Sequence, residues 1–207
     1  MTLRVPRRSA ARIIRVTQCV LFSGAFVLLG YCAWVMTDAW RFQQDAQLDL
    51  SRQLQETATA VNPPHDPPIQ GMIGQGMIGR LDVARLGLSV MVMEGTTART
   101  LRHAAGHVEG TAFPGQNGNI GISGHRDTFF RSLRNIRDND IITIVTPNGH
   151  YRYRVVSTKV VDPANLAVLD SDGTEILTLI TCYPFYFVGP APNRFIVRAQ
   201  RVDDSQI

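Results

Sequence analysis

Negative charge is missing from the start of this sequence. No aspartate or glutamate occurs before Asp38, whereas the first 15 residues contain five arginines: Arg4, Arg7, Arg8, Arg12 and Arg15. Without those five arginines, the rest of the chain contains 16 of the 21 basic residues and all 17 acidic residues, which gives it a net charge of −1. The basic character is therefore local. This argues against nucleic acid as a partner, because a nucleic-acid-binding domain needs Lys and Arg clustered on its folded surface.

Cysteine is also scarce, which argues against a fold held together by disulfides. Of the three cysteines, Cys19 and Cys32 lie in an apolar N-terminal segment, and only Cys182 lies in the remainder of the chain. Cys182 therefore has no disulfide partner within that remainder. A lone cysteine in an exported domain is either buried and inert or a reactive thiol. A domain of about 130 residues can bury a core without such cross-links.

A long apolar segment follows the arginines. Residues 16–36 contain no charged residue, and this length is close to the roughly 20 residues that span a bilayer core as a helix. A cleaved signal peptide would have a shorter apolar region that ends in small residues, whereas this one ends in Ala33-Trp34-Val35-Met36. We therefore expect an uncleaved single-pass anchor. The basic segment 1–15 then lies in the cytoplasm, and the rest lies on the extracytoplasmic side of the cytoplasmic membrane.

The anchor is followed by two segments of different composition. Residues 37–61 are polar, rich in Gln, Ala and Leu, and free of Gly and Pro, which predicts a helical stalk. Residues 62–79 contain four prolines and two copies of Gly-Met-Ile-Gly, which predicts an extended linker. The folded domain is expected over 80–207, with its boundary near Arg80.

Short β-type segments alternate with turn signals from residue 81 onward. Residues 141–146 are rich in β-branched side chains and precede Asn148-Gly149, a strong hairpin signal. Further strands are expected at 88–93, 119–123, 151–161, 175–182 and 194–202, with one short helix within 97–105. This pattern predicts an all-β domain, either a closed or nearly closed barrel or a sandwich, and periodicity does not choose between them.

Three side chains with suitable chemistry lie at the ends of expected strands. Cys182 ends an apolar strand, His125 follows another strand, and Arg194 opens the last one. A thiolate is the nucleophilic form of cysteine, an imidazolium can protonate a leaving amine, and a guanidinium can stabilise an oxyanion. Each residue alone also has an ordinary structural explanation, and their spacing does not prove that they meet.

The motifs around these residues resemble one known family. Thr178-Leu179-Ile180-Thr181-Cys182 resembles the sortase signature Thr-Leu-x-Thr-Cys, and Arg194 follows Cys182 by 12 residues, as the arginine of that family does. The strings GNIGISGHRDTFFRSL and TLITCYPFYFVGPAPNRFIVRA are similar to class D sortases in particular. The segment 106–112 also resembles sortase sequences. The resemblance covers roughly residues 80–202, and three motifs in the right order are more specific than any one alone.

The resemblance implies an eight-stranded sortase-type β-barrel with one or two short helices, and a cysteine transpeptidase activity. Cys182 would be the nucleophile, His125 the proton donor, Arg194 the group that holds the substrate backbone or the oxyanion, and Thr181 would help to shape the substrate pocket. Substrates would be surface proteins with a Leu-Pro-x-Thr-Gly-like or Leu-Pro-x-Thr-Ala-like C-terminal signal. The acceptor would be an amine of a cell-wall peptide or a pilin lysine, and no cofactor is expected.

Other interpretations of the polar residues are weaker. His103 and His107 have the i, i+4 spacing of a helical zinc site and lie near Glu109, but Gly106 interrupts such a helix, so we expect no metal. No Asp or Asn motif pairs with His125 as a third triad member. Asp127 would share the histidine's face along a strand and is expected to give local support.

Two other enzyme families fit this sequence less well, and one binding function is an alternative. An L,D-transpeptidase resembles Ser-His-Gly-Cys at its cysteine, unlike the sequence around Cys182, and a papain-like protease has its cysteine before its histidine. The alternative from a different class is a non-catalytic, membrane-tethered β-barrel that binds a surface protein or peptide. Five aromatic residues fit a binding groove or a packed core equally well: Phe129, Phe130, Phe185, Tyr186 and Phe187.

Overall fold

The structure, a computed structural model, describes residues 7–59 and 76–202. The chain forms two compact units with their boundary between Arg41 and Phe42. Most of the expected linker 62–79 lies outside the described residues, as do residues 1–6 and 203–207.

One helix, α1 (Arg7–Thr59), covers both the expected anchor and most of the expected stalk. The apolar residues of its first part are exposed, among them Leu21, Phe26 and Leu29. By length and composition this helix can cross a membrane. The helix predicted over 37–61 is present as far as Thr59, and the last two residues of that range are not described.

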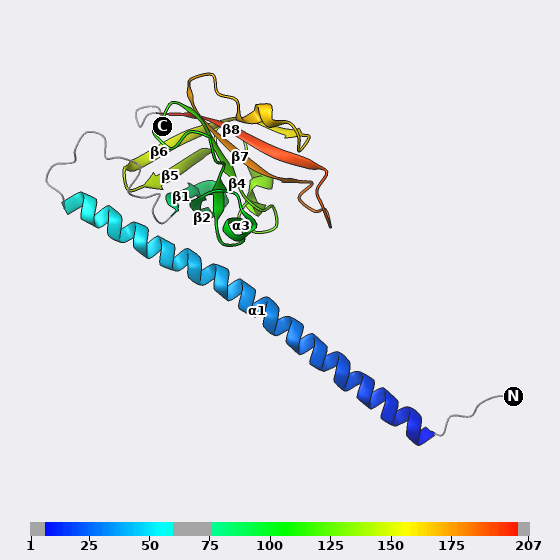
Figure 1. The fold of residues 1–207 in the computed structure, drawn as a ribbon. Coiled ribbons are helices and arrows are strands. Elements are labelled where there is room, and N and C mark those ends of the chain that lie inside the picture. The colour runs from blue at the N-terminus through cyan, green and yellow to red at the C-terminus, as the bar shows by residue number, and fades with distance from the viewer. Residues whose placement is uncertain (1–6, 60–75, 203–207) are drawn as a thin grey trace. The chain divides into compact units, whose positions relative to one another are not determined.

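The second unit is a closed barrel of eight strands (Figure 1), which confirms the barrel over the sandwich. The strand order is β1-β2-β3-β4-β7-β8-β6-β5, and β5 returns to pair with β1. The strands are β1 (Met77–Val83), β2 (Leu88–Glu94), β3 (Ala105–His107), β4 (Gly118–Ser123), β5 (Ile141–Thr146), β6 (Gly149–Val161), β7 (Glu175–Tyr183) and β8 (Asn193–Arg201). Neighbouring strands β4, β7 and β8 are far apart in sequence, so the barrel order brings distant residues together.

Apart from the end of α1, the helices described in the barrel unit are short. The expected helix is α3 (Ala98–His103), and the Thr97 side chain caps it by accepting a hydrogen bond from the Thr100 amide. Three single-turn 3₁₀ segments, η1 (Ala84–Leu86), η2 (Arg131–Asn135) and η3 (Leu166–Leu169), complete the connections.

The start of the barrel differs from the sequence expectation. Strand β1 begins at Met77, inside the range predicted as linker and three residues before the boundary expected at Arg80. The second Gly-Met-Ile-Gly copy forms a strand because Met77 and Ile78 are buried, and Met77 and Gly79 pair with Met93 and Val92 of β2. Its last glycine is needed for close approach, since a Cβ on Gly79 would lie 2.2 Å from the Val145 carbonyl oxygen.

The barrel interior is filled by alternate residues of the strands. Leu177 and Leu179 of β7, Val197 of β8 and Ile120 and Ile122 of β4 all belong to this core. Residues between them on each strand therefore face the outside of the barrel. This alternation fixes the face on which each candidate functional residue lies.

The part of α1 from Phe42 onward belongs to the barrel unit. Leu50 is fully buried in a second apolar cluster with Met77, Met91 and Val145. The Gln43 side chain accepts a hydrogen bond from the Met91 amide (3.0 Å) and donates one to the His103 carbonyl (2.5 Å). The stretch from Phe42 to Leu50 therefore packs as part of the folded domain.

Candidate active site

Cys182 and Arg194 lie directly opposite each other on neighbouring strands. Antiparallel strands β7 and β8 pair Cys182 with Arg194, and the next pair is Thr181 with Phe195. Side chains directly opposite on an antiparallel pair share a face, with Cβ atoms about 4.5–5.5 Å apart. The fold thus brings two of the three predicted site residues together.

His125 follows the end of β4, the strand that borders β7 on its other side. Parallel strands β4 and β7 pair Ser123 with Ile180, and the Gly124 amide donates to the Ile180 carbonyl at 3.1 Å. Strand β4 ends at Ser123, and His125 is the second residue after it. The predicted site residues therefore come from three adjacent strand ends, although 57 and 12 residues separate them along the chain.

Cys182 and Arg194 lie on the outer face of the barrel. Cys182 and Arg194 alternate with the core residues of β7 and β8, such as Leu179 and Val197. Cys182 and Arg194 are partly exposed and His125 is exposed. A thiol at such a position can be reached by a substrate, unlike a buried structural cysteine.

Arg194 is anchored through one nitrogen. Its Nη1 donates to the carbonyls of Asn193 (3.1 Å) and Ala191 (3.4 Å). A guanidinium has five N–H donors and stays charged at any physiological pH. Within the described part of the chain no hydrogen bond of Nε or Nη2 is recorded, so these donors can face a developing negative charge.

Thr181 lies on the opposite face of β7 from Cys182. It is 2% exposed, and its hydroxyl donates to the Gly124 carbonyl at 2.7 Å. This bond fastens the residue before the candidate nucleophile to the residue before His125. The geometry favours a role in holding the two strand ends together over direct contact with a substrate.

The chain turns away from the strand after Gly124, so strand alternation does not extend to Asp127. The Asp127 side chain is 71% exposed, and its carboxylate lies 3.5 Å from Arg126 Nε. Asp127 therefore pairs with Arg126, and the support expected for His125 from strand alternation has no structural basis.

Arg126 is the residue that sequence reasoning overlooked. Its buried guanidinium donates to the carbonyls of Pro184, Phe187 and Gly189, all in the loop between β7 and β8. The only sequence signal was its position directly after His125. Nothing in the local pattern indicates that this arginine turns inward.

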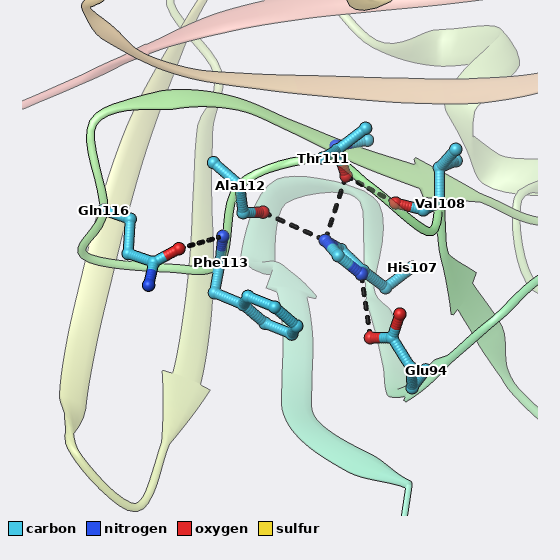
Figure 2. Close-up of polar contacts among 8 residues, drawn as sticks. Glu94, His107, Val108, Thr111, Ala112, Phe113 and Gln116 are labelled. Atoms are coloured by element: carbon cyan, nitrogen blue, oxygen red, sulfur yellow. Dashed lines mark hydrogen bonds and ion pairs between the residues drawn. The ribbon is translucent and has the colours of Figure 1, made fainter. Parts of the chain in front are cut away.

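A second polar cluster surrounds His107 at the end of β3 (Figure 2). Nδ1 lies 2.9 Å from Glu94 Oε2, and Nε2 lies 2.9 Å from the Ala112 carbonyl and 3.0 Å from Thr111 Oγ1. Thr111 Oγ1 also accepts from the Gly121 amide, so the cluster fastens the segment after β3 to strand β4. Both ring nitrogens are engaged, and His103 and His107 lie on different elements.

No group of three metal-ligating side chains occurs among the residues that the structure describes. The His103–His107 spacing that suggested a zinc site is divided between the end of α3 and strand β3, so the two side chains do not share a helix face.

The aromatic residues divide between core and surface. Phe130 is fully buried, and Phe129 and Phe185 pack against the core. Tyr186 and Phe187 are exposed in the β7–β8 loop. Beneath the candidate site, Phe195 contacts Tyr183 and Phe185 with ring centroids 6.3 and 5.3 Å away. Core packing thus accounts for three of the five aromatic residues that fit either a groove or a core: Phe129, Phe130 and Phe185.

Comparison with known proteins gives one consistent family. The model of a family described as a sortase domain matches residues 81–202. Over 125 residues the chain is 36% identical to "Sortase D" of Bacillus subtilis (strain 168), a match that covers 60% of this chain and 63% of that one. It is 29% identical over 150 residues to "Sortase SrtE1" of Streptomyces coelicolor, covering 63% and 42%. The chain therefore spans less than two thirds of these relatives.

The fold is also similar to solved structures. A sortase D5 transpeptidase of Clostridium perfringens superposes with a TM-score of 0.64 at 23% identity, covering 79% of this chain and 99% of that one. Sortase A of Corynebacterium diphtheriae, a lid mutant, gives a TM-score of 0.59 at 25% identity, covering 77% and 97%.

Proposed function

The chain belongs to the sortase family, with class D supported by its relatives, and from this premise we propose that it is a cysteine transpeptidase. Its nucleophile is Cys182, its proton donor and acceptor is His125, and Arg194 stabilises the oxyanion or holds the substrate backbone. The observation that carries the proposal is the order of strands β4, β7 and β8: Cys182 pairs with Arg194 across β7 and β8, and His125 follows the end of β4, the other neighbour of β7.

In the first half of the reaction the Cys182 thiolate attacks the threonine carbonyl of a Leu-Pro-x-Thr-Gly-like or Leu-Pro-x-Thr-Ala-like sorting signal. Negative charge develops on the carbonyl oxygen, where the Arg194 guanidinium stabilises it. The peptide C–N bond then breaks, and the leaving amine takes a proton from the His125 imidazolium. The product of this half is a thioester between Cys182 and the substrate.

In the second half an amine acceptor attacks the thioester carbonyl. The now neutral His125 accepts a proton from that amine, the C–S bond breaks, and the Cys182 thiolate leaves. A new amide bond joins the surface protein to its acceptor, an amine of a cell-wall peptide or a pilin lysine. The thiolate and imidazolium are restored, so the cycle needs no external oxidant or metal.

The first part of α1 anchors the enzyme in this proposal. The arginines before the apolar stretch favour a cytoplasmic N-terminus, which leaves the barrel on the extracytoplasmic side. Thr181 takes part without touching the substrate: it holds Gly124, and thereby the position of His125 relative to Cys182.

The proposal is tested with the full-length protein in detergent, a panel of fluorescent sorting peptides, and an added amine. We expect His125→Gln and Arg194→Met to lower the rate of amide formation by about 10²- to 10⁴-fold. The matched controls are His150→Gln, another exposed histidine, and Arg198→Met, which lies four residues further on the same face of β8. Both controls should retain wild-type rates.

Two outcomes would redirect the proposal. Cleavage by water alone at every amine concentration would indicate a protease. Binding of a surface protein or peptide without any cleavage, together with an unreactive Cys182, would favour the membrane-tethered binding barrel.

A further inference from the structure

Arg126 is a buried arginine whose hydrogen-bond partners are backbone carbonyls of a single loop. Nη1 donates to Pro184 O at 2.9 Å, and Nη2 donates to Phe187 O at 2.6 Å and to Gly189 O at 3.1 Å. The guanidinium carbon also lies 5.9 Å from the centre of the Phe187 ring. One side chain thus holds most of the loop between β7 and β8.

The electrostatics of this arginine are unfavourable for a purely structural residue. Arg126 is 6% exposed, and its Nε has no hydrogen-bond partner among the described residues. The carboxylate that accompanies it belongs to Asp127, which is 3.5 Å away and 71% exposed. The three carbonyl hydrogen bonds offset part of the cost of burying this charge, but apolar side chains often replace buried charges without loss of stability. Stability alone therefore does not explain why an arginine occupies this site.

Its place in the chain indicates what it does. Arg126 is bonded through its backbone to His125, and Pro184 is the second residue after Cys182. The planar fork of a guanidinium can bind several carbonyls in a fixed arrangement, which an ammonium cannot do. We infer that Arg126 is a positioning residue, which sets the loop after Cys182 relative to His125. This inference rests on the proposed function of that pair.

A second arginine holds the same loop from the outside. Arg134 of η2 donates to the Tyr186 hydroxyl at 2.6 Å, and its guanidinium carbon lies 5.5 Å from the centre of that ring. Both residues are exposed, as is Val188, which is 97% exposed. Exposed contacts of this kind contribute little, so the buried contact through Arg126 determines the loop conformation.

The test compares Arg126→Met and Arg126→Lys with the wild type and with Arg131→Met, an exposed arginine of the neighbouring η2. The first readout is the rate of Cys182 alkylation by iodoacetamide as a function of pH. The second is the rate at which chymotrypsin cleaves after Tyr186 or Phe187. All proteins are full-length and in the same detergent, and neither readout requires a sorting peptide.

In Arg126→Met we expect chymotrypsin cleavage to be about tenfold faster, because the loop opens more often. Alkylation at pH 7 should be roughly tenfold slower and its pH profile should move to higher pH, because the displaced imidazolium no longer favours the thiolate. Arg126→Lys should lie between methionine and wild type, and Arg131→Met should match the wild type.

An unchanged alkylation profile in Arg126→Met would overturn the inference, since faster cleavage alone reveals a merely structural tether. Unchanged cleavage would overturn it too. If Arg126→Met does not fold, the same criteria apply to Arg126→Lys. A wild-type protein that forms no acyl-enzyme with any peptide would contradict the proposed function, while these two readouts would still decide the role of Arg126.

Discussion

Thr181 is joined to Cys182 by a peptide bond, yet its side chain lies on the other face of β7. Its hydroxyl and the Gly124 carbonyl form a buried bond between the ends of β7 and β4. The residue acts on the proposed reaction through this bond, because any shift of Gly124 also shifts the next residue, His125.

Thr181→Val keeps the shape of the side chain and removes only its hydrogen-bond donor. Since the Gly124 carbonyl is then left buried without this partner, we expect a loss of about 1–3 kcal/mol in the free energy of unfolding. Cys182 alkylation should also slow. Thr181→Ser, which keeps the hydroxyl, should restore the alkylation rate. Urea unfolding and iodoacetamide kinetics measure the two effects, and a valine variant as stable as the wild type would contradict the role of this bond.

The role of a single residue could be predicted from sequence where the local pattern marks it, and not where its contacts lie far away along the chain. Cys182 and Arg194 stand at strand ends that the local pattern already marks, so both could be predicted. Arg126 could not, because its three carbonyl partners are 58, 61 and 63 residues further along the chain. Only the folded barrel brings them to it.

Single elements were predictable where their own composition decided the structure. Strand β5 begins and ends where its β-branched run predicted, before the Asn148-Gly149 turn. Strand β3 has only three residues and was not predicted, and pairing with β2 and β4 on either side makes it a strand. The same holds for the start of β1, which was predicted as the end of the Pro/Gly-rich linker 62–79.

An ion pair joins Arg85 of η1 to Asp140, the residue directly before β5. Hydrogen bonds from the Arg85 side chain, and then from the Arg137 amide, hold the pKa of the Asp140 carboxyl below its usual range despite its burial. Because the pKa is depressed in the folded state, this carboxylate stabilises the fold above the ordinary aspartate value of about 3.9. The contribution is lost as pH falls through the lower, folded-state pKa.

Asp140→Asn should therefore lower the free energy of unfolding at pH 7. The difference from wild type should be constant from pH 7 down to the ordinary aspartate value of about 3.9 and smaller at about pH 3, because below 3.9 the unfolded wild-type chain binds a proton that the folded carboxylate resists. Urea unfolding at both pH values measures this, with Asp138→Asn as an exposed control. A variant whose deficit is the same at both pH values would show that the charge of Asp140 is irrelevant.

Helix α1 contributes to the barrel unit through Gln43, which satisfies the buried Met91 amide. Gln43→Ala leaves that amide without this partner, so we expect a loss of about 1–3 kcal/mol in stability. Gln44→Ala, the exposed neighbour, should change stability by less than about 0.5 kcal/mol. Thermal unfolding of both full-length variants in detergent makes the comparison, and equal melting temperatures would contradict the packing of this stretch against the barrel.

At the scale of the whole molecule, the site is a product of strand order. The sequence pattern predicted most strands and their approximate bounds, but periodicity carries no information on which strands become neighbours. The order β4-β7-β8 places a parallel pair beside an antiparallel one. It is this order that converts three separate strand ends into one proposed catalytic group.

The most direct test of the central claim is to trap the reaction intermediate. Full-length protein is mixed with a reactive sorting peptide, quenched in acid, and analysed by intact mass and peptide mapping. The account predicts an adduct with the mass of the N-terminal peptide fragment on Cys182, absent in Cys182→Ala and discharged into a new amide when an amine is added. Cleavage that persists in Cys182→Ala, or an adduct on any other residue, would contradict the account.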